Sequence, residues 1–302
     1  MYVFGLKNSA DVRTIFLCGA KPLLLWAVWH AYPMMPTWCL PFSVLLQALS
    51  AFVVATLVHN AMHCDVFAQW PMEFFWRVCL AGAFGFPVEA YKPTHNANHH
   101  VYTQHEEDHL HTSQMQYGRH WLNLLMFFPT VFPKISKLEN AYLKKEAKKL
   151  SWSFAAFLAQ MIAAHGLTVT LLVIDWRRCL CCWLVPNVMG VDAIITMNML
   201  QHDGCEEIKL GEHRGDKMNI NSARNFVGPV VNWFTCNNGY HTIHHMYANH
   251  HWTRYPDLHR KLVEPHIDPL LNERCLVRYI LRAYFCPGRL PAHRQEKAAK
   301  TQ

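Results

Sequence analysis

Charged residues are scarce in this sequence. Only 16% of its 302 residues are charged and 52% are hydrophobic, whereas charged residues make up about 25% of an average soluble domain. The high hydrophobic content excludes intrinsic disorder, and the scarcity of charge does not suit an ordinary soluble enzyme. A chain of this length has room for one membrane-embedded domain or two small soluble ones.

Two further features are missing. The 11 cysteines lack the paired spacing of a disulfide framework, so we expect reduced thiols. The opening residues, MYVFGLKNSADVR, lack the basic start, apolar core and small-residue cleavage site of a secretory signal. We therefore expect no cleaved signal there.

The charges that are present favour the positive sign. The formal net charge is +7, from 28 lysines and arginines against 21 acids. Such an excess suits nucleic acid, acidic lipid headgroups or another anionic partner. Because no zinc-finger, homeodomain or RNA-binding signature accompanies it, we expect a membrane setting and no nucleic-acid partner.

Four apolar runs suit bilayer-spanning helices, which need about 20 mostly apolar residues each. Two of the runs contain no charged residue, and the last contains a single acid, Asp192. The first run is the shortest and includes Lys21 and Pro22, although a lysine side chain can extend toward the headgroups. The sequence thus predicts an all-α membrane protein with four transmembrane helices, at about residues 14–31, 38–58, 152–174 and 179–200.

Two other apolar stretches are not expected to cross the bilayer. Residues 74–91 are interrupted by Arg77, Glu89, proline and glycine, which favours an interfacial or re-entrant segment. Residues 121–132 are too short. The basic stretch over residues 137–150 suits either a helix lying on anionic lipid or a solvated helix face.

The distribution of positive charge predicts the orientation. Nine lysines and arginines lie between the second and third predicted spans and fourteen follow the fourth, against two in the loop between spans three and four. Because positively charged loops stay on the cytoplasmic side, residues 59–151 and 201–302 are predicted to be cytosolic. No repeat or linker divides them. We expect one domain over residues 1–302, with a histidine-rich cytosolic cap.

Histidine is unusually frequent, and its arrangement is informative. There are 21 histidines, 19 of them in the two predicted cytosolic segments. Several stand four residues apart, a spacing that places two side chains on one helix face. Three compact boxes, HNAMH, HNANHH and HTIHH, and one histidine four residues after Asn198 supply nine candidate metal ligands: His59, His63, His95, His99, His100, His202, His241, His244 and His245.

Nine histidine ligands are too many for one ion. Neutral imidazole binds iron, zinc and copper at ordinary coordination numbers of about four to six. The boxes therefore predict two metal ions close to one face of the membrane. A site there, on the cytoplasmic side, could act at the end of a tunnel that reaches into the bilayer.

These boxes and their order resemble those of the membrane fatty acid desaturase superfamily. The resemblance extends from about His59 to His259 and implies a non-haem di-iron centre that uses O2, with four helices under a cytosolic cap. It also implies that Asn198 acts on a metal through water and that an acyl lipid is the substrate. The stretch NNGYHTIHH is more similar to bacterial-type members of the superfamily than to animal stearoyl-CoA enzymes. No HPGG haem motif is present, so electrons are expected from a separate cytochrome b5-type or ferredoxin-type donor.

For other polar residues near the boxes, the sequence leaves more than one role open. His105, Glu106 and Asp108 are candidates for holding ligand imidazoles from behind, although a solvated loop is equally compatible. Asp192 lies within a predicted span, so we expect it either to pair with Lys21 or to line the substrate tunnel. His250, His251 and His259 are predicted to be surface or supporting groups rather than ligands.

Rival functions fit less well. A zinc hydrolase would need a carboxylate such as that of HExxH, and a metal transporter would need polar ligands at mid-membrane depth. HExxH is absent and the spans hold few polar residues. The expected function is O2-dependent oxidation of a fatty acyl chain, preferably desaturation; hydroxylation and decarboxylation to a terminal alkene are the alternatives. The active site is expected on the cytoplasmic side of the endoplasmic reticulum or, in a bacterium, the inner membrane.

Overall fold

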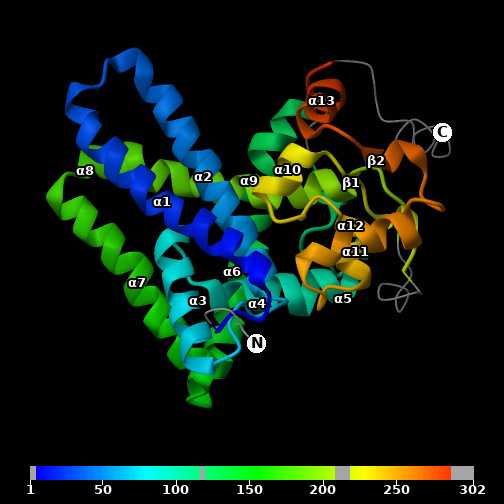
Figure 1. Cartoon of the computed structure of the whole chain (residues 1–302), viewed down its shortest axis with the longest axis horizontal. Helices are drawn as coiled ribbons and strands as arrows, with labels where there is room; N and C mark the ends of the chain where they lie inside the picture. The colour runs from blue at the N-terminus through cyan, green and yellow to red at the C-terminus, as the bar shows by residue number, and fades with distance from the viewer. Residues whose placement is uncertain (1–4, 116–119, 208–217, 287–302) are drawn as a thin grey trace. The chain divides into compact units, whose positions relative to one another are not determined.

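The computed structural model describes residues 5–115, 120–207 and 218–286 (Figure 1). Most of these residues are helical, which confirms the predicted all-α class. Two short strands, β1 (Asn225–Phe226) and β2 (Asn272–Glu273), pair in parallel. The helices are α1 (Val12–Ala31), α2 (Leu40–Ala61), α3 (Trp70–Phe84), α4 (Tyr91–Thr94), α5 (His100–Tyr102), α6 (His120–Lys148), α7 (Trp152–Ile174), α8 (Trp176–Cys179), α9 (Val185–His202), α10 (Pro229–Phe234), α11 (His241–Met246), α12 (Tyr255–Leu258) and α13 (Leu276–Ile280).

The chain divides into two compact units. Unit 1 comprises Met1–Thr94 and Lys137–Ile194, and unit 2 comprises His95–Ser136 and Ile195–Gln302. Each unit is assembled from two separate stretches of chain, and α6 and α9 contribute residues to both. Neither unit is therefore a consecutive domain.

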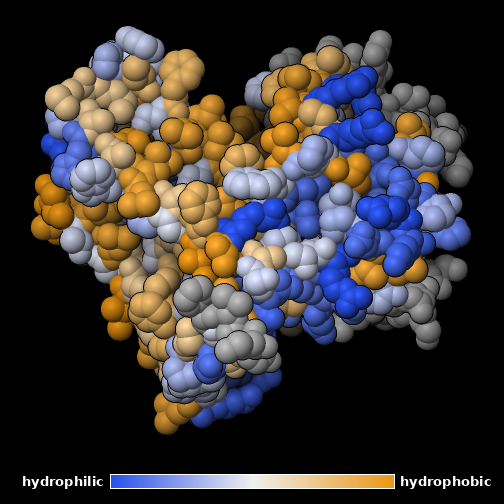
Figure 2. Space-filling view, viewed as in Figure 1, coloured by the Kyte–Doolittle hydropathy of each residue, from blue (hydrophilic) through white to orange (hydrophobic). Residues whose placement is uncertain are grey.

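Among the described residues, four helical segments are long and apolar enough to cross a membrane, as the sequence predicts. They cover Ser9–Met34, Thr37–Ala61, Trp152–Ile174 and Trp176–His202. Within unit 1, α1 packs against α2, and α3 packs against both α2 and α7 (Figure 1). The surface over α1, α2 and α7 is predominantly hydrophobic (Figure 2), as lipid-facing helices require.

The first span extends beyond both predicted ends, and it continues through Lys21. The Lys21 side chain is buried, and its Nζ donates to Asn187 Oδ1 over 2.7 Å. The ammonium also lies 5.2 Å from the centroid of the Trp183 ring. Asn187 therefore supplies a hydrogen-bond acceptor to a polar group that would otherwise be costly to bury inside a bilayer.

Residues 74–91 do not form a spanning helix. They contribute to α3, which has 15 residues and ends at Gly85, where φ is +85°. A Cβ atom on Gly85 would lie 2.6 Å from Asn187 Nδ2. Glycine is therefore needed both for the backbone conformation and for space.

α6 joins two stretches that the sequence suggests separately. The apolar residues 121–132 and the basic residues 137–150 fall largely on this single helix of 29 residues, which includes Pro129 and Pro133. Each proline lacks a backbone N–H and so removes one helical hydrogen bond. The helix nevertheless continues through both positions.

Candidate metal centre

Four buried histidines of unit 2 form a compact cluster, here called the tetrad. Each offers one ring nitrogen, and these nitrogens all lie within 4.8 Å of one another. Within the cluster, His241 Nε2 is 3.0 Å from His202 Nε2 and 3.1 Å from His245 Nε2. The members are His99, His202, His241 and His245.

Three helical segments deliver these side chains. His202 ends α9, and His241 and His245 lie one turn apart on α11. His99 ends a π-helical turn, His95–His99, that precedes α5. π-Helical turns often occur at functional sites, and this one places two boxes and the end of the last span around one point of unit 2.

Partners behind the rings set the tautomers of two tetrad members. His99 Nδ1 lies 2.9 Å from Asp108 Oδ2, and His202 Nδ1 lies 2.9 Å from the Ser222 carbonyl oxygen. A carbonyl oxygen can only accept, so His202 must carry its proton on Nδ1. Its Nε2 then presents a lone pair to the tetrad, and a charged Asp108 has the same effect on His99.

The charge of Asp108 is maintained although the residue is buried. Burial raises the pKa of Asp108, but His99 and the backbone N–H groups of Gln104 and Leu110 outweigh it and hold the pKa below its ordinary value. Asp108 is therefore a carboxylate that accepts the His99 Nδ1–H bond.

Thr103 sets the tautomer of a third tetrad ring, that of His245. Its hydroxyl donates to the His99 carbonyl oxygen over 2.8 Å, and its oxygen lies 3.3 Å from His245 Nδ1. Because the hydroxyl proton is already used, the oxygen accepts from His245 Nδ1–H. The Nε2 lone pair of His245 is thereby also directed into the tetrad.

The tetrad fits a transition-metal ion. His99 Nε2 is buried and has no hydrogen-bond partner among the described residues. Burial lowers the pKa of His241 well below its ordinary value, so this ring is neutral. Neutral imidazoles whose unprotonated nitrogens face one another cannot all form hydrogen bonds among themselves. Such a set of lone pairs is what iron, zinc or copper requires.

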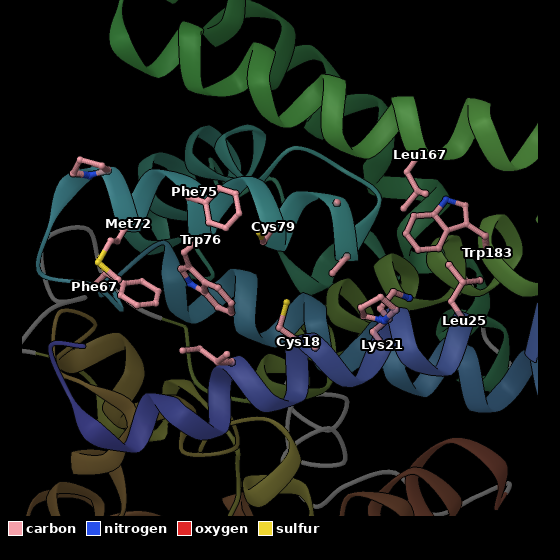
Figure 3. A pocket seen from close by; sticks show the side chains of 16 residues that line it. Cys18, Lys21, Leu25, Phe67, Met72, Phe75, Trp76, Cys79, Leu167 and Trp183 are labelled. Carbon is pink, nitrogen blue, oxygen red and sulfur yellow. The ribbon is translucent and has the colours of Figure 1, made fainter. Parts of the chain in front are cut away.

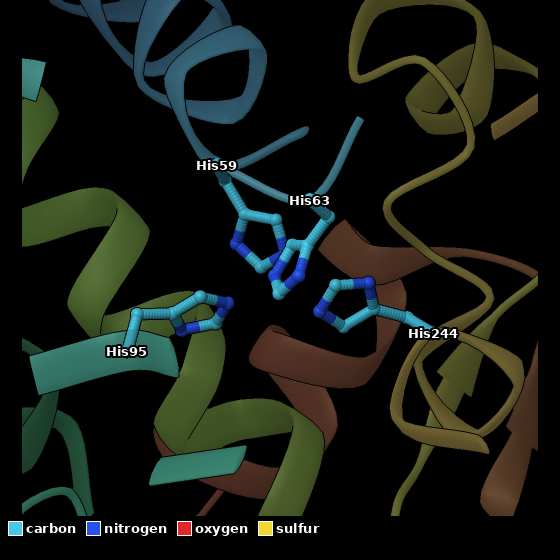
Figure 4. Close-up of side chains that lie close together, drawn as sticks. All are labelled: His59, His63, His95 and His244. Carbon is cyan, nitrogen blue, oxygen red and sulfur yellow. The ribbon is translucent and has the colours of Figure 1, made fainter. Parts of the chain in front are cut away.

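The remaining box histidines form a pair in unit 1 and a group of three in unit 2. In unit 1, His59 and His63 at the end of α2, here called the helix-end pair, have ring centroids 5.6 Å apart (Figure 4). The Tyr91 hydroxyl lies 3.5 Å from His59 Nδ1. The His59 side chain is buried and that of His63 is half-buried.

In unit 2, His95 and His244 have nearly parallel rings, with centroids 5.8 Å apart (Figure 4). His100 Nε2 lies 3.1 Å from His95 Nε2 and 2.9 Å from His244 Nε2. His244 Nδ1 is 3.4 Å from the Tyr255 hydroxyl. All three box histidines of this second group are buried, as a metal-binding cluster requires.

The other predicted site residues are more scattered. His105 Nδ1 contacts the Glu107 carboxylate in a partly exposed loop, and Glu106 is exposed. Asn198 is buried one helical turn before His202, and its Nδ2 has no hydrogen-bond partner among the described residues. Asp192 is half-buried on α9, and its Oδ1 likewise has no partner there.

Several supporting residues were not predicted. Thr103 follows His99 by four residues, so the helix spacing could have indicated it, whereas Ser222 acts through its backbone and leaves no signal in the sequence. The Lys21 amine contacts Asn187 rather than Asp192. His259, predicted at the surface or in support, is buried beside Tyr240, and burial lowers its pKa.

Residues 35–271 match the Fatty acid desaturase family, a range that includes all nine candidate ligand histidines. No curated protein shows a significant match to the chain.

Proposed function

Because this chain belongs to the fatty acid desaturase family, it is an oxidoreductase, and we propose that it uses O2 to oxidise a fatty acyl or related lipid chain, with desaturation as the reaction. The observation that carries this proposal is the tetrad. Its converging Nε2 lone pairs, set by Asp108, Ser222 and Thr103, suit a metal rather than a proton-transfer role.

The metals are proposed to be two irons. An unactivated methylene carries no acidic proton, and bound iron would supply the oxidising chemistry with O2 that side chains lack. The tetrad would hold one ion. The helix-end pair together with His95, His100 and His244 would hold the second, with Asn198 acting through water. The superfamily resemblance and the spacing of the boxes support this second assignment.

The roles of the protein residues follow from their contacts. Asp108, Ser222 and Thr103 orient the tetrad rings from behind and keep their Nε2 atoms deprotonated. The apolar spans hold the acyl substrate in the bilayer, and Asp192 is proposed to line its tunnel. We further propose a cytoplasmic active site and a separate electron donor of cytochrome b5 or ferredoxin type.

One experiment tests the central claim. The protein is purified in detergent, its metal content is measured, and acyl substrates are supplied with a reductase system and O2. We expect about two irons per chain and a product that mass spectrometry finds to be two hydrogens lighter. A product heavier by one oxygen would identify a hydroxylase instead. Native zinc without O2 consumption would overturn the proposal.

Two variants provide the matched comparison. His245→Ala should abolish iron at the tetrad and with it the oxidation. His251→Ala should leave both intact, because His251 is partly exposed and its Nδ1 contacts Thr253 in its own turn. Equal metal content in the two variants would contradict the ligand assignment.

A further inference from the structure

Unit 1 contains a cavity that the proposed function does not use. Its volume is about 750 Å³, and it lies between α1 and α3, with single contributions from Phe67 before α3, from α7 and from the turn before α9 (Figure 3). The lining includes Ile15, Cys18 and Leu25 on α1 and Phe75 and Cys79 on α3. All lining residues belong to unit 1.

The cavity offers nothing to a polar ligand. Its lining is overwhelmingly apolar, and Lys21 is the only charged residue among the lining side chains. The Lys21 amine is already bound to Asn187 Oδ1 and lies close to the Trp183 ring. A buried water needs two to four polar partners, so this space suits a hydrocarbon occupant.

The dimensions match one lipid tail. The lining extends along α1 from Ile15 to Leu25, and the ten steps between these residues correspond to about 15 Å at a rise of 1.5 Å each. The hydrocarbon core of a bilayer is about 30 Å thick, so each leaflet contributes about half of that. Gly19 leaves open space in the cavity, because no other atom lies within 4 Å of where its Cβ atom would be.

We propose that this cavity is a lipid-binding groove that holds one acyl chain of a bilayer phospholipid. The groove lies between helices of unit 1 whose outer surface is apolar, so phospholipid is the apolar ligand present at highest concentration around them. The bound chain would complete the packing between α1 and α3. This proposal is independent of the chemistry assigned to the histidines.

A site-resolved crosslinking experiment tests the groove. The protein is placed in nanodiscs with phosphatidylcholine that carries a photoreactive diazirine in one acyl chain, and adducts are mapped by peptide mass spectrometry. We expect adducts concentrated on the groove residues of α1 and α3. Gly19→Leu fills the groove and should reduce these adducts about tenfold, because several methylenes lose their apolar contacts.

Gly166→Leu is the matched control. Gly166 also lies on a spanning helix with nothing within 4 Å of an added Cβ, but it does not line the groove. It should leave the groove adducts unchanged. Ile15→Trp provides a second way of filling the groove if Gly19→Leu fails to fold. Adducts spread evenly over all spanning helices, or equal adducts in groove-filling and control variants, would overturn the proposal.

A separate observation in unit 2 concerns its surface. α10 exposes Val230, Trp233 and Phe234 by 71%, 45% and 47%. α13 and the π-helical turn after it, Leu281–Phe285, expose Val277, Leu281 and Phe285 by 65%, 53% and 53%. The β1–β2 pairing brings the starts of these helices together, since Val227 N donates to Glu273 O over 2.9 Å.

Basic residues border this apolar surface. Arg274, Arg278 and Arg282 are exposed and recur every four residues along the same segment, and the opposite side is buried through Tyr279, Ala283 and Tyr284. Hydrophobic and hydrophilic residues adjoin at α13 in Figure 2. An apolar face bordered by arginines is the pattern of a helix that lies in the headgroup region of an anionic bilayer.

The structure therefore also assigns α10 and the Leu276–Phe285 segment as a docking surface for an anionic lipid leaflet. Hydrogen exchange in nanodiscs tests it, with phosphatidylcholine alone or mixed with phosphatidylglycerol. Amide exchange of residues 276–286 should slow about fivefold with the anionic lipid, and Arg278→Glu should remove that effect. Lys261→Glu, an exposed charge reversal elsewhere in unit 2, should not. Equal exchange in both nanodiscs would overturn the assignment, and a protein partner would then be the alternative occupant of this surface.

Discussion

The tetrad of unit 2 and the helix-end pair of unit 1 use the same side chain in different surroundings. Asp108, Ser222 and Thr103 lie behind three tetrad rings at 2.9, 2.9 and 3.3 Å, and the whole tetrad is buried. At the helix-end pair, the Tyr91 hydroxyl is 3.5 Å from His59 Nδ1, and His63 is only half-buried. Histidine spacing alone therefore does not indicate which groups contact the far side of each ring or how deeply the ring is buried.

The largest effect is expected when a tetrad ring is removed. His241→Ala deletes a proposed ligand that lies close to both His202 and His245, so metal content should fall from about two ions per chain to about one. His63→Ala should leave the tetrad ion in place. Metal analysis of both variants checks this. A tetrad ion lost equally in both variants would contradict the contrast between the two sites.

The next effect concerns the charge behind His99. Asp108→Asn keeps the shape but removes the carboxylate that fixes the His99 tautomer. Loss of such a supporting partner typically weakens metal affinity by about 10- to 100-fold. Competition with a chelator measures this affinity, and Glu106→Gln, at an exposed acid of the same loop, is the control that should leave it unchanged.

Burial of the tetrad should also make the stability of the metal-free protein depend on pH. Because burial lowers the pKa of His241, His241 stays neutral when folded but takes up a proton on unfolding below about pH 6.5. The unfolded state then binds more protons, so stability falls as the pH decreases, by up to about 1.4 kcal/mol per pH unit. Thermal unfolding at pH 7.5 and 5.5 tests this, and His241→Gln should reduce the dependence.

A smaller effect is expected at Thr103. Thr103→Val removes the oxygen that accepts from His245 Nδ1, at a cost of about 1 kcal/mol, or a few-fold in metal affinity. Thr103→Ser retains the oxygen and should restore the affinity. If Ser and Val at this position weaken binding equally, the hydroxyl does not orient His245.

The smallest effect is expected at the helix-end pair. The Tyr91 hydroxyl lies at the outer limit of a hydrogen bond to His59. Tyr91→Phe should therefore change metal affinity less than Thr103→Val does, as measured by the same chelator competition. A loss as large as that of Asp108→Asn would show that unit 1 holds its ligands as firmly as unit 2.

The spans and the boxes could be predicted because they depend on local sequence. A run of apolar residues long enough to cross a bilayer needs no distant partner, and all four predicted spans are present. The first and last spans extend beyond their predicted ends, and Lys21 on the first span donates to Asn187, 166 residues away. No local pattern identifies that contact.

The second box shows where local reasoning ends. The spacing of His95 and His99 predicts a shared helix face, yet a π-helical turn forms there, and His95 Nε2 lies 3.1 Å from His100 Nε2. His99 instead joins His202, His241 and His245. Which histidines form a set depends on α9 and α11, which follow in the chain far from this turn.

The sequence by itself determined that this chain is helical, membrane-spanning and equipped with clustered histidines, because hydrophobic run length and residue spacing are local properties. Only the tertiary structure decided which rings converge and where their protons lie. Those outcomes depend on Asp108, Thr103 and the Ser222 carbonyl contacting the far side of each imidazole. A ring nitrogen becomes a metal ligand only when the other nitrogen holds the proton.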